Sequence, residues 1–168
     1  MSNETNNSNA PAASKKDAEL RYKEIIGLLP HRAPLLLVDK VLSLDTSAMV
    51  IEAIKCVSTL DPVFEGHFPG DPVFPGVYVV EGLAQTSALL CFSYYREAGI
   101  EFEQRTMLTS IDEARFRKPI VPGDVLHYHV KYERSRGLFA WFTGQARVKG
   151  ELVGEAKFSA LLPTRLKK

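Results

Sequence analysis

The feature that most constrains the fold is a stretch of 19 residues, Val77 to Tyr95, with one charged side chain, Glu81. Its leucines and alanines favour a helix, and residues 96–99 give it a polar end with a glycine stop. A membrane span is the obvious alternative. However, glycine, glutamine, serine and threonine interrupt the stretch, and neither flank is strongly basic. We therefore predict a helix buried among other elements of a globular fold.

The rest of the ordered chain favours strands. Two aliphatic segments, Leu35–Leu44 and Ala48–Val57, flank a polar turn and predict a strand pair. Apolar and polar side chains alternate over residues 126–133, which places one face of that strand on the helix. A short amphipathic helix is expected over Ala18–Leu29, before Pro30. Further strands are expected at residues 107–116, 124–133, 138–149 and 151–162.

Six strands and one long buried helix predict an α+β fold, in which an antiparallel sheet curls around a long central helix. At 168 residues the chain is long enough for one domain with a full core, which we place at residues 20–164. Residues 1–19 are polar, lack an apolar run and predict a disordered tail rather than an export signal. Residues 165–168 form a short basic tail.

Charge and cysteine content narrow the possible partners. The formal net charge is +1, so no overall field favours nucleic acid or an anionic membrane. The two cysteines, Cys56 and Cys91, have neither disulfide-like nor metal-binding spacing and are interpreted as reduced residues. Together with the polar N-terminus, this predicts a cytoplasmic protein that binds neither nucleic acid nor a membrane.

A short segment before the long helix has the composition of a catalytic site. His67 lies between glycines in a loop rich in glycine and proline, and Pro75-Gly76 then opens the helix. The first N–H groups of a helix have no intrahelical partner, so the Gly76 amide could bind an oxyanion. Glu81 follows in the second turn, with Gln85 on the same face. A base, a backbone donor and an acid suffice to remove a proton beside a carbonyl and expel a hydroxyl.

Each part also has a plainer interpretation. A lone histidine in a loop is more often structural than catalytic, and a backbone amide or a tyrosine could satisfy a buried glutamate. The two imidazoles of His127 and His129 share one strand face, but the sequence offers no third ligand, so we predict no metal site.

The segment GHFPGDPVFPGVYVVEGLAQ, residues 66–85, closely resembles the active-site segment of the β-hydroxyacyl-acyl carrier protein dehydratases of type II fatty acid synthesis, the FabZ type. Residues 29–39 and 114–124 agree with the same family, in the same order. The resemblance implies the hot-dog fold, a long helix wrapped by an antiparallel sheet. It also implies a homodimer whose active site takes His67 and Glu81 from different subunits, with a trimer of dimers as the common assembly.

The implied reaction is the dehydration of a (3R)-hydroxyacyl thioester on acyl carrier protein to the trans-2-enoyl thioester, which makes the protein a hydro-lyase. His67 would be the base and the Gly76 N–H the oxyanion donor. Glu81 would deliver a proton to the leaving hydroxyl or only orient it. No metal or organic cofactor is required. The other residues expected around the substrate, which could equally be ordinary core, are Phe68, Phe74, Pro75, Val77 and Gln85.

Acyl carrier protein is acidic, so a basic rim is expected near the active site. A charge-rich strand edge can also be merely solvated. The candidates for the rim are Arg115, Arg117, Lys118, Arg134 and Arg136.

Three other functions are compatible with a hot-dog fold. An acyl-CoA thioesterase would hydrolyse the thioester and release a free thiol. An (R)-specific enoyl-CoA hydratase carries its acid close to its histidine, whereas here Glu81 follows His67 by 14 residues. A non-catalytic acyl-thioester sensor would need a DNA-binding element, for which residues 1–19 are too short and too polar.

Overall fold

The computed structural model describes residues 18–162. Its helices are α1 (Tyr22–Leu28), the short 3-10 helix η1 (Pro62–Glu65) and α2 (Gly76–Glu97). Its strands are β1 (Lys40–Asp45), β2 (Val50–Cys56), β3 (Met107–Phe116), β4 (Val125–Arg136), β5 (Phe139–Val148) and β6 (Glu151–Leu161). The six strands form one antiparallel sheet in the order β1-β2-β4-β5-β6-β3.

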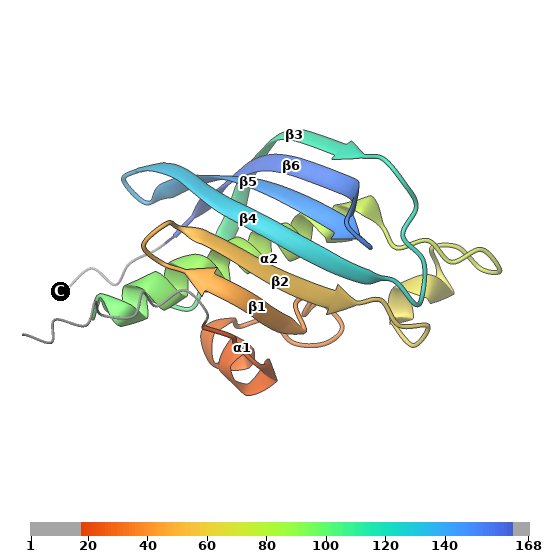
Figure 1. Ribbon diagram of the computed structural model, residues 1–168, viewed down its shortest axis with the longest axis horizontal. Coiled ribbons are helices and arrows are strands. Elements are labelled where there is room, and N and C mark those ends of the chain that lie inside the picture. Colours follow the sequence, from red (N-terminus) through yellow and green to blue (C-terminus); the bar gives the residue numbers. More distant parts are fainter. Residues whose placement is uncertain (1–17, 163–168) are drawn as a thin grey trace, which may run out of the picture.

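Helix α2 lies across one face of the sheet, with α1 below β1 and the β4–β5 hairpin at the opposite end from the loop that precedes α2 (Figure 1). The predicted α+β hot-dog arrangement, a long helix wrapped by a six-stranded antiparallel sheet, is therefore confirmed. The disordered and basic tails expected at the two ends lie outside the described residues, except for residues 18 and 19.

Burial of α2 explains its apolar composition. Residues 85–93 are buried without a break, and the core around them includes Leu83, Phe142 and Phe158. The hydroxyl of Thr86 donates to the carbonyl of Gly82, at 2.7 Å, so this polar side chain is satisfied within the helix. The predicted buried helix is confirmed. Within residues 18–162 no helix is long and apolar enough to cross a membrane.

Helix and sheet pack closely at Gly82. A β-carbon at this position would lie 2.3 Å from the hydroxyl oxygen of Tyr128, which is fully buried on β4. Only glycine leaves room for the tyrosine ring against the helix backbone. The alternation predicted for β4 is confirmed, because Leu126, Tyr128 and Val130 are buried while the residues between them are not.

Two elements begin well after their predicted starts, and β4 runs on to Arg136 instead of ending at residue 133. Strand β1 begins at Lys40 rather than Leu35, because the side-chain amide of Gln85 binds the backbone of residues 35 and 37. A side chain on α2 thus takes the place of a neighbouring strand. Helix α1 begins at Tyr22 rather than Ala18, because the backbone of Leu20 pairs with Val41 on β1.

Candidate active site

The imidazole of His67 is fixed in one orientation by its own loop. Its Nδ1 lies 2.6 Å from the carbonyl oxygen of Val73. The backbone of His67 also accepts from the Val73 N–H and donates to the carbonyl of Val63. Because a carbonyl oxygen can only accept, Nδ1 must carry the proton. Neutral His67 therefore presents Nε2 as an unprotonated acceptor, the form that a general base needs.

The His67 ring lines a cavity of about 320 Å³ that also contains the start of α2. The Gly76 N–H at this helix start has no hydrogen-bond partner among the described residues, as expected for the first turn. The residue with the unpaired backbone donor and the imidazole thus line one cavity. The other lining residues are Val73, Phe74, Val79, Phe116, Arg117, Lys118, Pro119, Ile120 and Val153.

The lack of a side chain at Gly76 serves packing as well as access. A β-carbon at Gly76 would lie 2.9 Å from three ring carbons of Phe116, at the end of β3. The sequence interpretation gave Gly76 the role of an oxyanion donor through its amide. The structure adds that the aromatic ring beside the helix start also requires a glycine here.

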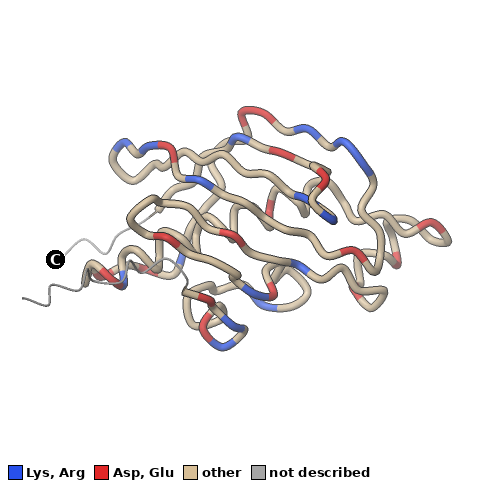
Figure 2. The backbone as a smooth tube through the Cα atoms, viewed as in Figure 1, with Lys and Arg blue, Asp and Glu red and all other residues tan. Residues whose placement is uncertain are grey.

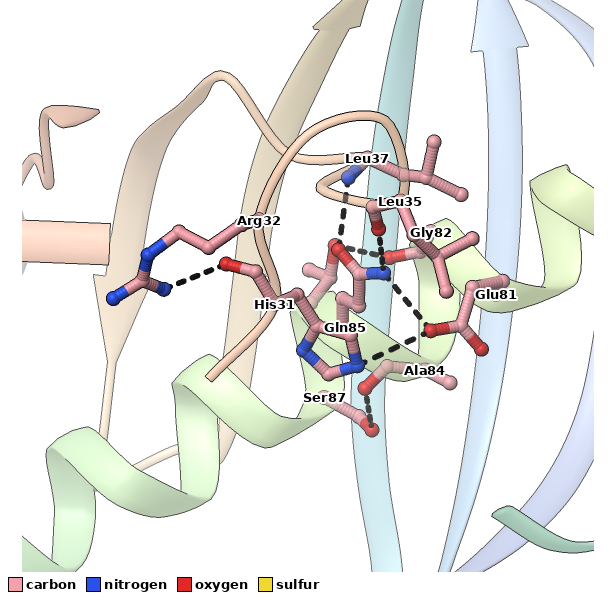
Figure 3. Close-up of polar contacts among 10 residues, drawn as sticks. His31, Arg32, Leu35, Leu37, Glu81, Gly82, Ala84, Gln85 and Ser87 are labelled. Carbon is pink, nitrogen blue, oxygen red and sulfur yellow. Dashed lines mark hydrogen bonds and ion pairs between the residues drawn. The ribbon is translucent and has the colours of Figure 1, made fainter. Parts of the chain in front are cut away.

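Glu81 is held by a second group of polar side chains, drawn in Figure 3. Its Oε1 accepts a hydrogen bond of 2.9 Å from Nε2 of Gln85, one turn further along α2. Gln85 is itself fixed, since it donates to the carbonyl of Leu35 and accepts from the N–H of Leu37. The amide is only 1% exposed, so it holds the glutamate from a rigid position.

His31 is a neighbour of Glu81 that the sequence interpretation missed. Its Nε2 lies 3.5 Å from Glu81 Oε1. The residue belongs to the block 29–39 that matched the dehydratases, so a histidine in a matching block was the available signal. Tyr128 is a further titratable neighbour, because burial, together with the charges of Asp39 and Glu81, raises its pKa. The phenol therefore remains neutral.

His67 and Glu81 do not meet within one chain. Among residues 18–162 no hydrogen bond or ion pair joins them, and Glu81 does not line the His67 cavity. One chain thus places His67 and Gly76 on the same cavity, and holds Glu81 in a separate group with His31 and Gln85.

The apolar residues expected around the substrate lie in different environments. Phe74 is buried and lines the His67 cavity, and Pro75 caps the start of α2. Phe68 stacks on the His67 ring, with centroids 4.0 Å apart, yet is 53% exposed. Val77 is 68% exposed. Phe68 and Val77 therefore form exposed apolar surface beside the cavity, of the kind that a partner or ligand covers.

In one chain the five basic candidates fall into two groups. Figure 2 shows one group of basic residues where β3 leads into the next loop and another at the β4–β5 hairpin. Arg117 and Lys118 line the His67 cavity and pair with glutamates on β6, while Arg115 precedes them on β3. Arg134 and Arg136 end β4, at the hairpin, where the Arg134 guanidinium lies 3.8 Å from the Trp141 ring centre.

The two histidines on β4 have no third metal ligand among the described residues. Within residues 18–162 no group of three or more histidine, cysteine, aspartate or glutamate side chains could hold a metal ion. His127 and His129 share Glu52 as a neighbour, at 3.1 and 3.9 Å. This arrangement is an ion-pair cluster on the sheet, away from His67.

Comparison with known proteins decides the family. The sequence model of the FabA-like domain matches residues 29–157. The chain belongs to the FabA-like family. Among the curated members, the 3-hydroxyacyl-acyl-carrier-protein dehydratase FabZ of Methylobacterium nodulans is 44% identical over 140 residues, which cover 83% of this chain and 87% of that protein. The FabZ of a Nitratiruptor species is 45% identical over 141 residues, covering 83% and 95%.

A solved structure shares the fold. The dehydratase heterocomplex ApeI:P from Xenorhabdus doucetiae contains a chain that matches with a TM-score of 0.72. The match covers 84% of this chain and 91% of that one, at 21% sequence identity. At this identity the likeness shows a common fold.

Proposed function

We propose that the protein dehydrates (3R)-hydroxyacyl groups, carried as thioesters on acyl carrier protein, to trans-2-enoyl thioesters. The observation that carries the proposal is the bond from His67 Nδ1 to the Val73 carbonyl, which leaves Nε2 unprotonated on a ring that lines the same cavity as Gly76, whose N–H has no partner among the described residues. The curated relatives are 3-hydroxyacyl-acyl-carrier-protein dehydratases, which supports the same reaction.

In this reaction Nε2 of His67 removes the α-proton, which the thioester carbonyl has already made acidic. Negative charge then develops on the carbonyl oxygen, where the Gly76 N–H donates to it at the positive end of α2. Glu81 protonates the β-hydroxyl, or orients it while His67 returns the proton, and water leaves. The chemistry needs no metal or organic cofactor.

We infer that the acid comes from a second copy of the chain. The cavity contains His67 but not Glu81, so one chain alone would lack the acid. Strand β3 ends the sheet and has no strand on its outer side within residues 18–162. A free edge with apolar side chains is a ready surface for strand pairing. Its large exposed apolar residues are Met107, Leu108, Ile111 and Phe116.

The positions of the basic residues indicate which of them could bind the carrier protein. Arg117 and Lys118 lie at the cavity, so they, with Arg115 before them, form the rim that we propose for the acidic carrier protein. Arg134 and Arg136, at the far hairpin, have no such position within one chain. The trimer of dimers and the cytoplasmic location stay predictions.

The test uses the purified full-length protein with a (3R)-hydroxybutyryl thioester and, in the reverse direction, a crotonyl thioester. We expect ultraviolet absorbance of the enoyl thioester to rise in the first reaction and fall in the second, with no release of free thiol. Thiol release would indicate a thioesterase instead. Binding of the acyl thioester without turnover would indicate a sensor.

A further inference from the structure

We propose that His31 is a positioning residue for Glu81, and that the loop carrying it is part of the acid's machinery rather than a passive connection. The proposal rests on the proposed function, because it assigns Glu81 its orientation in that reaction. The observation behind it is that Nε2 of His31 lies 3.5 Å from Oε1 of Glu81.

The tautomer of His31 follows from its surroundings. Its Nδ1 is buried and has no hydrogen-bond partner among the described residues. Glu81 Oε1 acts as an acceptor, so the ring nitrogen that faces it can bond to it only if that nitrogen carries the proton. Neutral His31 therefore carries its proton on Nε2, the atom that faces Glu81. The contact is longer than an optimal hydrogen bond, and such contacts shorten when the substrate is bound.

One hydrogen bond and one imidazole contact on the same oxygen give the carboxyl group a fixed direction. Gln85 and His31 both approach Oε1, from α2 and from the loop respectively (Figure 3). Oε2 has no hydrogen bond or ion pair among the described residues. A carboxyl group held by one oxygen keeps the other available to the substrate hydroxyl, and a displacement of about 1 Å can cost a hundredfold in rate.

The loop that carries His31 is itself tied down at both ends. The Arg32 guanidinium donates to the carbonyls of His31, Leu29 and Ile26, which include the free carbonyls at the end of α1. On the other side Gln85 binds the backbone of residues 35 and 37. The imidazole is thus presented to Glu81 from a rigid support, as a positioning residue requires.

The decisive experiment compares His31→Gln with His31→Asn in the full-length protein. A glutamine amide nitrogen reaches the place of Nε2, whereas an asparagine amide stops near Nδ1, so the two variants share polarity and differ in their reach. We expect His31→Asn to lower kcat about ten- to a hundredfold with KM little changed. His31→Gln should recover most of the lost rate, and both should melt at the same temperature.

A second measurement tests whether His31 acts through Glu81. Adding His31→Asn to Glu81→Gln should reduce the residual rate no further, because the acid that His31 positions is already gone. His127→Asn is the matched control, since this histidine also contacts a glutamate, but on the sheet. It should leave both kcat and KM unchanged.

The possible outcomes separate this inference from the proposed function. A wild-type protein with no dehydration or hydration activity overturns the proposed function. An active wild type whose His31→Asn variant is equally active overturns only the role of His31. Equal losses in the asparagine and glutamine variants, or a loss confined to KM, also overturn it, since either would indicate general support of the loop. If the Glu81→Gln variant is too slow to measure, the comparison of His31→Asn with His31→Gln decides the role of His31.

Discussion

His67 Nδ1 lies 2.6 Å from the carbonyl oxygen of Val73, six residues further along the same loop. The contact fixes both the ring plane and the tautomer, so the loop itself supplies the orienting group that a catalytic histidine otherwise takes from a carboxylate. The loop is therefore part of the proposed catalytic machinery.

His67→Ala removes the base while leaving the rest of the cavity in place. We expect turnover of a (3R)-hydroxybutyryl thioester to fall by about 10² to 10⁴, the usual contribution of a general base. Thermal unfolding should change little, because the ring borders a cavity rather than filling the core. A variant that keeps full activity would show that another group removes the α-proton.

Gln85→Met would deprive two backbone groups of their partner. The N–H of Leu37 and the carbonyl of Leu35 both bond to this buried amide, and each unpaired group costs about 1–3 kcal/mol. We expect the free energy of unfolding in urea to fall by about 2–5 kcal/mol, with a loss of activity as Glu81 is released. The exposed Gln104→Met is the control, and equal losses in both variants would contradict this assignment.

Gly76→Ala tests the contact between the start of α2 and β3. The added methyl group would lie 2.9 Å from the Phe116 ring, so helix or ring must shift. We expect a loss of about 1–3 kcal/mol in stability, as for other overpacked sites, and a lower rate because the Gly76 N–H moves. Gly27→Ala, where nothing lies within 4 Å of the new methyl, should not destabilise the protein. If both variants are equally stable, the packing argument is wrong.

Alkaline pH should weaken the fold through Cys91. Burial raises the pKa of this thiol from 9.0 to about 12. The folded protein therefore keeps a proton that the unfolded chain releases above pH 9, so stability is fully present below that pH and falls as pH rises, by up to about 1.4 kcal/mol per pH unit. Urea unfolding at pH 8 and pH 10 measures the loss. Cys91→Ala should flatten the dependence, and an unchanged slope would contradict it.

The sequence predicted the helices and strands well where the local pattern is strong. It did not predict a boundary that depends on a single distant side chain. The span of α2 and the whole of β3 follow from local composition. The late start of β1 does not, because it depends on Gln85, which is 48 residues away from Leu37. A distant amide that replaces a strand partner leaves no local pattern in the sequence.

The candidate site likewise contains residues that the sequence identifies and contacts that only the folded structure shows. Residues in one segment, such as His67 and Gly76, were identified from their order and spacing. The contact between His31 and Glu81 joins residues 50 positions apart, so it appeared only in the folded structure. The basic candidates fall into two groups in one chain, because Arg117 and Lys118 line the His67 cavity whereas Arg134 and Arg136 end β4; a common rim of all five stays a prediction.

The central claim is that one active site takes His67 from one subunit and Glu81 from the other. It is tested by mixing two inactive variants, His67→Ala and Glu81→Gln, under conditions that exchange subunits. A mixed dimer would contain one site with both residues intact and one site with neither. We predict that dehydratase activity returns on mixing, to about a quarter of the wild-type rate when exchange is random. A mixture that forms mixed dimers but stays inactive would contradict the shared site.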